Sequence, residues 1–115
     1  MQPDLVRVRH MLDAAREVQQ FTAGRSREDL DRDQLLVRGV TKSIEIIGEA
    51  AARVSAAFRS AHPEIPWQDA ILMRNRLVHG YFDIDLDIVW STAQQDVPTL
   101  AVLLETLVAA NPPAE

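Results

Sequence analysis

The chain has 115 residues, a length typical of one domain, and its 47% hydrophobic and 25% charged residues exclude a disordered or low-complexity protein. It contains no cysteine, which excludes disulfides, thiolate nucleophiles and cysteine-ligated metal centres. The net charge of −5 excludes general attraction to nucleic acid or anionic lipid, so any contact with RNA or DNA must be local.

The apolar segments are too short for a membrane span or a secretory signal. Charged residues interrupt the first twenty positions, and the longest apolar runs, 100–104 and 107–110, fall far short of the roughly 20 residues that cross a bilayer. We therefore expect a cytoplasmic protein with no membrane contact.

The first predicted helix runs from about Asp4 to Phe21, where apolar residues recur at steps of three and four. A polar stretch around Gly24 interrupts this pattern. Ser26 or Asp31 is then expected to cap the helix that follows.

The second predicted helix is long, because the helical period continues for more than twenty residues. Its apolar positions are Leu36, Val40, Ile44, Ile47, Ala51, Val54 and Phe58. Small residues at its centre, Gly48, Ala50, Ala51 and Ala52, would let another helix or a second subunit approach closely.

A turn is expected at 62–66, because a residue before proline disfavours helical geometry and proline lacks a backbone donor. Pro66 suits the first position of a short third helix. This helix is predicted to continue through Trp67 and to end near Gly80, a residue that suits a left-handed C-cap.

An aspartate within 83–87 is expected to cap a fourth helix. Its apolar side is formed by Leu86, Val89, Trp90, Ala93, Val97, Leu100, Leu104 and Leu107. Pro98 should kink or divide this helix, and the tail 111–115 should be frayed. No convincing strand pattern is present, so the sequence predicts one all-α domain over residues 1–110, an antiparallel bundle of about four main helices.

A cluster at the end of the third predicted helix combines fixed positive charge, an imidazole and a phenol: Arg74, Asn75, Arg76, His79 and Tyr81. Because an α-helix turns about 100° per residue, Arg74 and His79 converge only if the helix ends between or beside them. The alternative is structural, since Arg76 and His79 suit a helix C-terminus and Tyr81 could simply pack. Physical considerations alone favour this alternative.

The sequence resembles the HEPN superfamily, and within it the HepT-like toxins of toxin–antitoxin pairs. The family's Arg-x4-His-x-Tyr signature stands here as Arg74, His79 and Tyr81, with its polar residue as Asn75. Segments 44–50, 63–67, 81–85 and 88–90 also look like the family, and the resemblance extends from the first predicted helix to about residue 104.

The resemblance implies a metal-independent endoribonuclease of a type VII-like toxin–antitoxin system that needs no cofactor. The active cleft would form where two motif helices meet in a homodimer. His79 would act as general base or acid, Arg74 would hold the scissile phosphate, and Asn75 would orient either group. Arg76 would bind the RNA backbone, or would be a salt-bridged helix residue. Attack by a ribose 2′-hydroxyl would require RNA and not DNA.

Tyr81 has a different implied role. In related systems, an MntA-like minimal nucleotidyltransferase antitoxin transfers AMP from ATP onto this tyrosine, and the added phosphate would compete with RNA beside Arg74 and His79. Larger assemblies of toxin and antitoxin are also compatible with these residues. The alternative function is a non-catalytic helical dimer that serves as the binding subunit of a nucleotidyltransferase.

The remaining acidic candidates favour structural interpretations. Asp83, Asp85 and Asp87 lack the glycine and distal glutamate of a calcium loop, so helix capping is preferred and no metal is assigned. Glu45 and Glu49 lie four apart on one helical face; they could line a cleft, but a solvated or salt-bridged face is the default expectation.

The isolated histidines and the tryptophans also favour structural roles. His10 and His62 have no partner at ligand spacing and are expected at the surface. Trp67 and Trp90 are expected to anchor the core or an interface rather than to stack on nucleobases.

Overall fold

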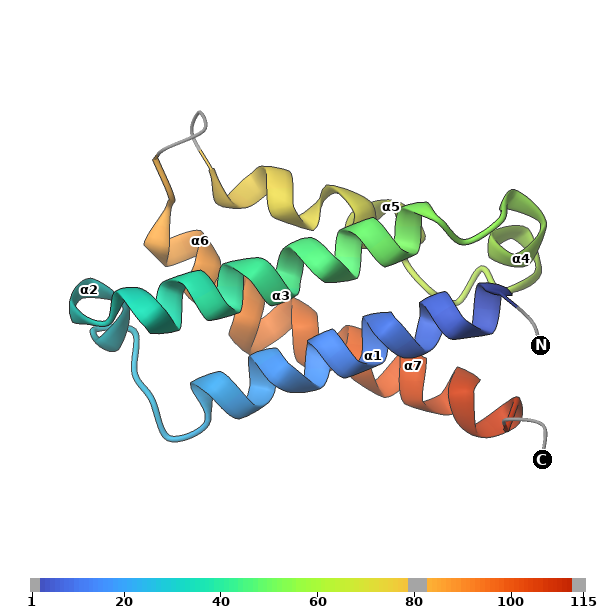
Figure 1. The fold of residues 1–115 in the computed structure, drawn as a ribbon, viewed down its shortest axis with the longest axis horizontal. Helices are drawn as coiled ribbons and strands as arrows, with labels where there is room; N and C mark the ends of the chain where they lie inside the picture. Colours follow the sequence, from blue (N-terminus) through green and yellow to red (C-terminus); the bar gives the residue numbers. More distant parts are fainter. Residues whose placement is uncertain (1–2, 79–82, 113–115) are drawn as a thin grey trace.

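The computed structural model describes residues 3–78 and 83–112, and Figure 1 shows their arrangement as a bundle of helices. The α-helices are α1 (Pro3–Thr22), α2 (Asp29–Arg32), α3 (Gln34–Ala52), α4 (Ala56–Ala61), α5 (Trp67–Leu72), α6 (Leu86–Ser91) and α7 (Val97–Ala110). In Figure 1, α1 and α3 run antiparallel, α7 packs on α1, and α5 packs on α3 from the other side. The prediction of an all-α antiparallel bundle is confirmed.

The core lies where the apolar stripes of α1, α3 and α7 meet. Its fully buried side chains include Val8, Met11, Val18, Val40, Ile44, Ile47, Leu77, Leu100 and Leu104. Burial of each such aliphatic side chain contributes roughly 1.5–3 kcal/mol. Among the described residues, no helix combines the length and the apolar character that crossing a bilayer would require.

The predicted long second helix is wrong in its C-terminal third. α3 ends at Ala52, and a separate helix, α4, begins after Ser55, whose hydroxyl accepts a hydrogen bond from the Phe58 amide at 3.1 Å. Asp4 of α1 holds Ser55 in this position, because its carboxylate accepts from the Ser55 amide and hydroxyl at 2.8 Å each. A contact with a distant part of the chain therefore ends a helical pattern that the apolar spacing would continue.

The predicted cap of this helix was also wrong. Neither Ser26 nor Asp31 caps α3; Asp33 does, in extended backbone geometry, and its carboxylate accepts from the Leu36 amide at 3.1 Å. The Arg25 guanidinium donates to the same carboxylate at 2.7 Å and holds the pKa of Asp33 below its ordinary value.

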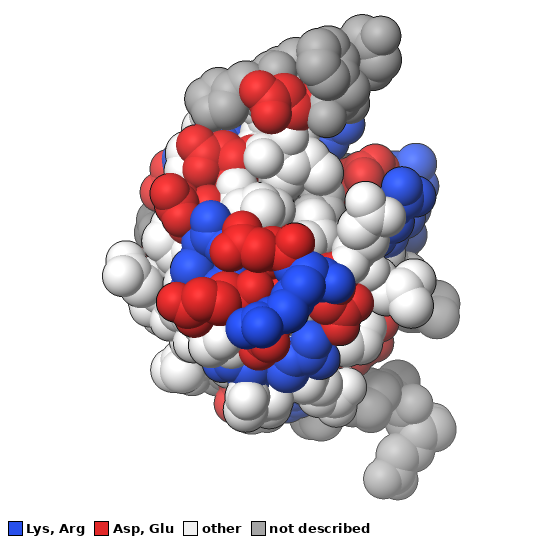
Figure 2. Space-filling model, turned by 90° about the vertical axis from the view of Figure 1, so that its left-hand side faces the viewer, with Lys and Arg blue, Asp and Glu red and all other residues white. Residues whose placement is uncertain are grey.

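Arginine and aspartate side chains interleave over the end of the molecule that carries α2, as Figure 2 shows. The ion pairs there are Arg25–Asp29, Arg25–Asp33, Arg27–Asp31, Arg32–Asp29 and Arg27–Asp87. The last joins this end to α6 at 2.7 Å. Exposed pairs of this kind contribute little stability individually. They involve three of the protein's 12 basic residues.

The third predicted helix changes its geometry before the motif ends. After α5 the chain tightens into a 3₁₀ helix, Met73–Leu77, and Val78 is extended. Pro66 precedes α5 instead of occupying its first position, and the predicted C-cap, Gly80, lies outside the described residues. The predicted single helix from Pro66 to Gly80 is thus wrong beyond Leu72, because spacing over five residues does not distinguish 3₁₀ from α geometry.

The chain on either side of residues 79–83 is held together. Val78 and Ile84 form an isolated antiparallel bridge, and the Asp85 amide donates to the Leu77 carbonyl at 2.7 Å. The Asp85 side chain then accepts from the Ile88 amide at 3.1 Å and caps α6. The prediction of an aspartate cap for this helix is confirmed.

The predicted break near Pro98 is also confirmed. A π-helical turn, Thr92–Asp96, separates α6 from α7, and the Val97 amide donates to the Thr92 carbonyl. Pro98 follows in the first turn of α7, where a missing amide donor costs little.

Asn111, the first residue of the tail that the sequence predicts to be frayed, makes two hydrogen bonds to the rest of the chain. Its side-chain amide donates to the Leu107 carbonyl at 3.0 Å, and its own carbonyl accepts from Arg9 of α1 at 2.8 Å. Residues 113–115 lie outside the described part of the chain.

Candidate functional site

The motif residues Arg74 and Asn75 line a hollow of about 340 Å³ at the junction of α3 and the 3₁₀ helix. The other lining residues are Glu45, Gly48, Glu49 and Ala52 of α3 and Ile71 of α5. We call this hollow the motif pocket. The motif pocket brings Arg74 and Asn75 together with Glu45 and Glu49, the two glutamates for which the sequence allowed a place in a cleft.

Local packing fixes the position of these side chains. Met73 and Leu77 are buried and anchor the 3₁₀ helix in the core, which leaves Arg74 and Asn75 exposed. Gly48 allows α5 to approach, since a Cβ atom there would lie 3.2 Å from the carbonyl oxygens of Ala70 and Ile71. The expectation that small residues of this helix admit a close neighbour is confirmed at Gly48.

The charge of Arg74 is not compensated by a contact in the described part of the chain. No carboxylate there lies within ion-pair distance of Arg74, although Glu45 and Glu49 line the same pocket. Glu45 lies 3.9 Å from the Lys42 ammonium. An arginine in this situation can donate two hydrogen bonds to an incoming phosphate or carboxylate.

Arg76 lies elsewhere. Its guanidinium donates to Asp69 at 3.0 Å, and it lines a different hollow of about 210 Å³ between α5 and α7 with Asp96, Thr99 and Leu100. The structure therefore does not bring Arg76 together with Arg74. Its ion pair with Asp69 agrees with the alternative prediction, that Arg76 is a salt-bridged helix residue.

His79 and Tyr81 lie outside the described residues, so their predicted roles stay predictions. Arg74 and His79 were expected to converge only if the helix ends between or beside them, and the described chain meets this condition. The helical segment ends at Leu77, and Val78 is extended, so Arg74 and His79 are not separated by a regular helix.

The other histidines and the tryptophans have structural surroundings. His10 is exposed as expected, whereas His62 is half-buried, with its ring centroid 4.4 Å from that of Phe58 and its Nδ1 atom 3.5 Å from Glu64. Trp67 is buried and its indole donates to the His62 carbonyl at 3.0 Å. Trp90 packs against the core from its edge, so both tryptophans have the core role that was predicted.

The aspartates of 83–87 differ in what they contact. Asp85 caps α6, and Asp87 pairs with Arg27. Within residues 3–78 and 83–112 no group of three histidine, aspartate or glutamate side chains is arranged to hold a metal ion.

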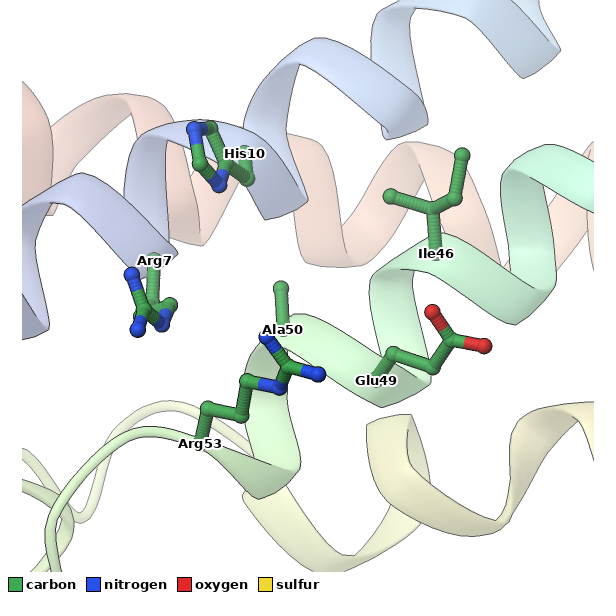
Figure 3. A pocket seen from close by; sticks show the side chains of 6 residues that line it. All are labelled: Arg7, His10, Ile46, Glu49, Ala50 and Arg53. Atoms are coloured by element: carbon green, nitrogen blue, oxygen red, sulfur yellow. The ribbon is translucent and has the colours of Figure 1, made fainter.

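Sequence reasoning missed a second hollow, of about 190 Å³, between α1 and α3 (Figure 3). It is lined by Arg7, His10, Ile46, Glu49, Ala50 and Arg53. The only signals in the sequence were the spacing of Arg7 and His10 on one face of α1, and the four-residue spacing of Glu49 and Arg53 at the end of α3. Neither pair indicates that the two faces meet.

Comparison with known proteins matches residues 11–107 to the ribonuclease HepT-like family model. The chain is 37% identical over 90 residues to a probable ribonuclease HepT of Thermococcus cleftensis, covering 78% of this chain and 82% of that protein. It is 35% identical over 91 residues to a candidate RNase of Caldanaerobacter subterraneus, covering 79% and 81%. A candidate RNase of Methanocaldococcus jannaschii is 32% identical over 90 residues, covering 78% and 83%. No solved structure matches the chain. The family match covers most of the chain, including Arg74, Asn75, His79 and Tyr81, and the chain therefore belongs to the HepT-like family of the HEPN superfamily.

Proposed function

We propose that the protein is a metal-independent endoribonuclease in which Arg74, Asn75 and His79 form the catalytic group. The observation that carries the proposal is an arginine of the family motif that lines an open pocket and has no ion-pair partner on the described chain. Membership of a ribonuclease-like family and the names of the relatives support the same activity.

The proposed reaction is an in-line attack by the ribose 2′-hydroxyl on the adjacent phosphorus. His79 takes the proton of the 2′-hydroxyl as the new P–O bond forms, and the 5′-oxygen leaves with a proton from an acid or from water. Arg74 donates hydrogen bonds to the phosphate oxygens as charge develops on them, and Asn75 orients His79 or the phosphate. The products are a 2′,3′-cyclic phosphate and a 5′-hydroxyl, so DNA is not a substrate.

We further propose that two copies pair so that their motif segments meet, which doubles the cationic groups in one cleft. Leu72 directly precedes the motif helix and is 38% exposed, so it offers apolar surface that such a contact would cover. In this arrangement each motif pocket borders the other, and the assembled cleft is the active unit.

Regulation is proposed to act on Tyr81. An MntA-like nucleotidyltransferase antitoxin would transfer AMP from ATP to its phenol oxygen, with release of pyrophosphate. The phosphate added two residues after His79 would compete with RNA phosphate for Arg74. The protein would then be the toxin of a toxin–antitoxin pair, active when Tyr81 is unmodified.

The test is cleavage of total RNA by purified protein in excess chelator, with the product ends assayed for cyclic phosphate. His79→Ala should lower the rate by roughly 10²–10⁴-fold, and Arg74→Ala by roughly 10²–10³-fold. Arg76→Ala is the matched control, because Arg76 is paired with Asp69 in a different hollow, and it should cleave like the wild type.

Full activity of His79→Ala would refute the assignment of the catalytic group. If the wild type does not cleave RNA, its intact mass separates two explanations: a gain in units of AMP identifies a silenced enzyme. An unmodified and inactive protein would instead support the binding subunit of a nucleotidyltransferase.

A further inference from the structure

Two arginines, Arg7 and Arg53, line the hollow between α1 and α3 together with His10, Ile46, Glu49 and Ala50. Arg7 and His10 come from α1, and Arg53 comes from the residue that follows α3 (Figure 3). In Figure 3 the Arg53 side chain lies along α3 beside Ala50, and its guanidinium lies between Arg7 and Glu49 in that view. We call this hollow the Arg7–Arg53 pocket.

Neither arginine has an ion-pair partner in the part of the chain that the structure describes, whereas Arg16, Arg25, Arg27, Arg32, Lys42 and Arg76 each do. The Nε atom of Arg7 is buried and has no hydrogen-bond partner among the described residues. Asp4, one turn before Arg7, is already engaged through both carboxylate oxygens by Ser55. A buried donor without a partner carries a desolvation cost of about 1–3 kcal/mol.

The Arg7–Arg53 pocket adjoins the motif pocket. Glu49 lines both, so the two hollows lie on either flank of the same exposed turn of α3. Arg53 follows Glu49 by four residues, a rise of about 6 Å along the helix. A strand whose scissile phosphate sits at Arg74 can therefore cross this turn and bring a neighbouring phosphate to Arg53 and Arg7.

We propose that the Arg7–Arg53 pocket binds a backbone phosphate of the RNA strand that flanks the cleavage site. This inference rests on the proposed ribonuclease function and extends its substrate contact beyond the motif, to α1 and the end of α3. It also explains how a protein of net charge −5 could hold a polyanion, because Arg7, Arg53 and Arg74, none of which is ion-paired on the described chain, line two adjoining hollows.

Salt dependence of RNA binding measures such contacts directly. Each phosphate neutralised on a single strand steepens the plot of log affinity against log salt by about 0.7. Loss of the contact with this one phosphate should therefore reduce the slope by about 0.7. A change in packing alone would weaken binding without changing the number of released ions.

The experiment uses full-length His79→Ala protein, which prevents cleavage, and a fluorescein-labelled oligouridine of about 16 nucleotides, long enough for an extended site. Anisotropy titrations over a range of salt concentrations compare Arg7→Ala, Arg53→Ala and the double variant. Arg38→Ala is the matched control, because Arg38 is an exposed arginine of α3 that lines neither pocket. Arg53→Lys retains the charge and should retain the slope.

A reduced slope in the Arg7 and Arg53 variants, with Arg38→Ala and Arg53→Lys unchanged, supports the proposal. An equal effect of all four single substitutions, or none, would overturn it. Arg53 is exposed, so Arg53→Ala decides the question even if Arg7→Ala does not fold.

Two further measurements separate this inference from its alternatives. Titration with ATP identifies a free nucleotide as the ligand: tight binding of ATP that depends on Arg7 and Arg53, together with an unchanged RNA slope, would overturn the proposal. Cleavage of RNA by the wild-type protein tests the proposed function independently, since the salt slope is measured on a variant that does not cleave.

Discussion

Gly48 lies where α3 meets α5, and replacing it with alanine should destabilise the protein although alanine is the better helix former. The new Cβ atom would lie 3.2 Å from the carbonyl oxygens of both Ala70 and Ile71. These are backbone atoms of a packed helix, so they yield less easily than a side chain. Overpacking of this kind costs about 1–3 kcal/mol, and the gain in helix propensity offsets about 1 kcal/mol.

We therefore expect Gly48→Ala to lose about 1 kcal/mol of unfolding free energy, a fall in Tm of roughly 4 °C. Gly39→Ala is the control on the same helix. A Cβ atom there meets only the ring of Phe21, at 3.3 Å, and this ring is a side chain that is 38% exposed rather than packed backbone. Gly39→Ala should therefore gain a few tenths to about 1 kcal/mol.

The assay is urea denaturation followed by circular dichroism, with all variants at one protein concentration. An equal gain of unfolding free energy in Gly48→Ala and Gly39→Ala would refute the reasoning, because it would mean that the backbone of α5 leaves room for a Cβ atom at Gly48. Since α5 leads directly into the helix that carries Arg74, we also expect Gly48→Ala to lower RNA cleavage more than Gly39→Ala does.

Two further predictions concern hydrogen bonds that begin helices. Hydrogen bonds from the Ser55 amide and hydroxyl lower the pKa of Asp4, so the Asp4 carboxylate stabilises the fold above its unfolded pKa and this stability is lost as pH falls through its folded pKa. Asp4→Asn should therefore make Tm decline less steeply below about pH 5, and an unchanged dependence of Tm on pH in this range would contradict the prediction. Asp85→Ala should cost about 1 kcal/mol through loss of the α6 cap, whereas Asp85→Asn, which keeps a side-chain acceptor, should cost only a few tenths; equal losses in urea denaturation would show that the cap is not the cause.

Elements defined by long apolar stripes could be predicted from the sequence. The predicted helix Asp4–Phe21 corresponds to α1 within one residue at each end, and the break near Pro98 follows from the missing donor of proline. The end of α3 could not be predicted, because Val54 and Phe58 continue its apolar spacing. What ends the helix is a pair of hydrogen bonds from Ser55 to Asp4, which depend on the tertiary fold.

The candidate site was predictable in its residues but only partly in its geometry. The motif identified Arg74 and Asn75, and the spacing of Glu45 and Glu49 indicated one helical face. That these four residues line one pocket depends on the close approach of α5 to α3. The Arg7–Arg53 pocket was missed because its arginines are far apart in sequence and belong to no motif.

The bridge between Val78 and Ile84 has a consequence for the motif spacing. The bridge fixes Val78 and Ile84 side by side, and so it fixes the two ends of the segment that joins them. Closure entropy grows with the logarithm of length, so two inserted residues would cost on the order of 0.3 kcal/mol. Folding stability is thus nearly indifferent to the interval between His79 and Tyr81. The interval between Arg74 and His79 is different, because its residues 75–78 belong to the 3₁₀ helix and to the bridge.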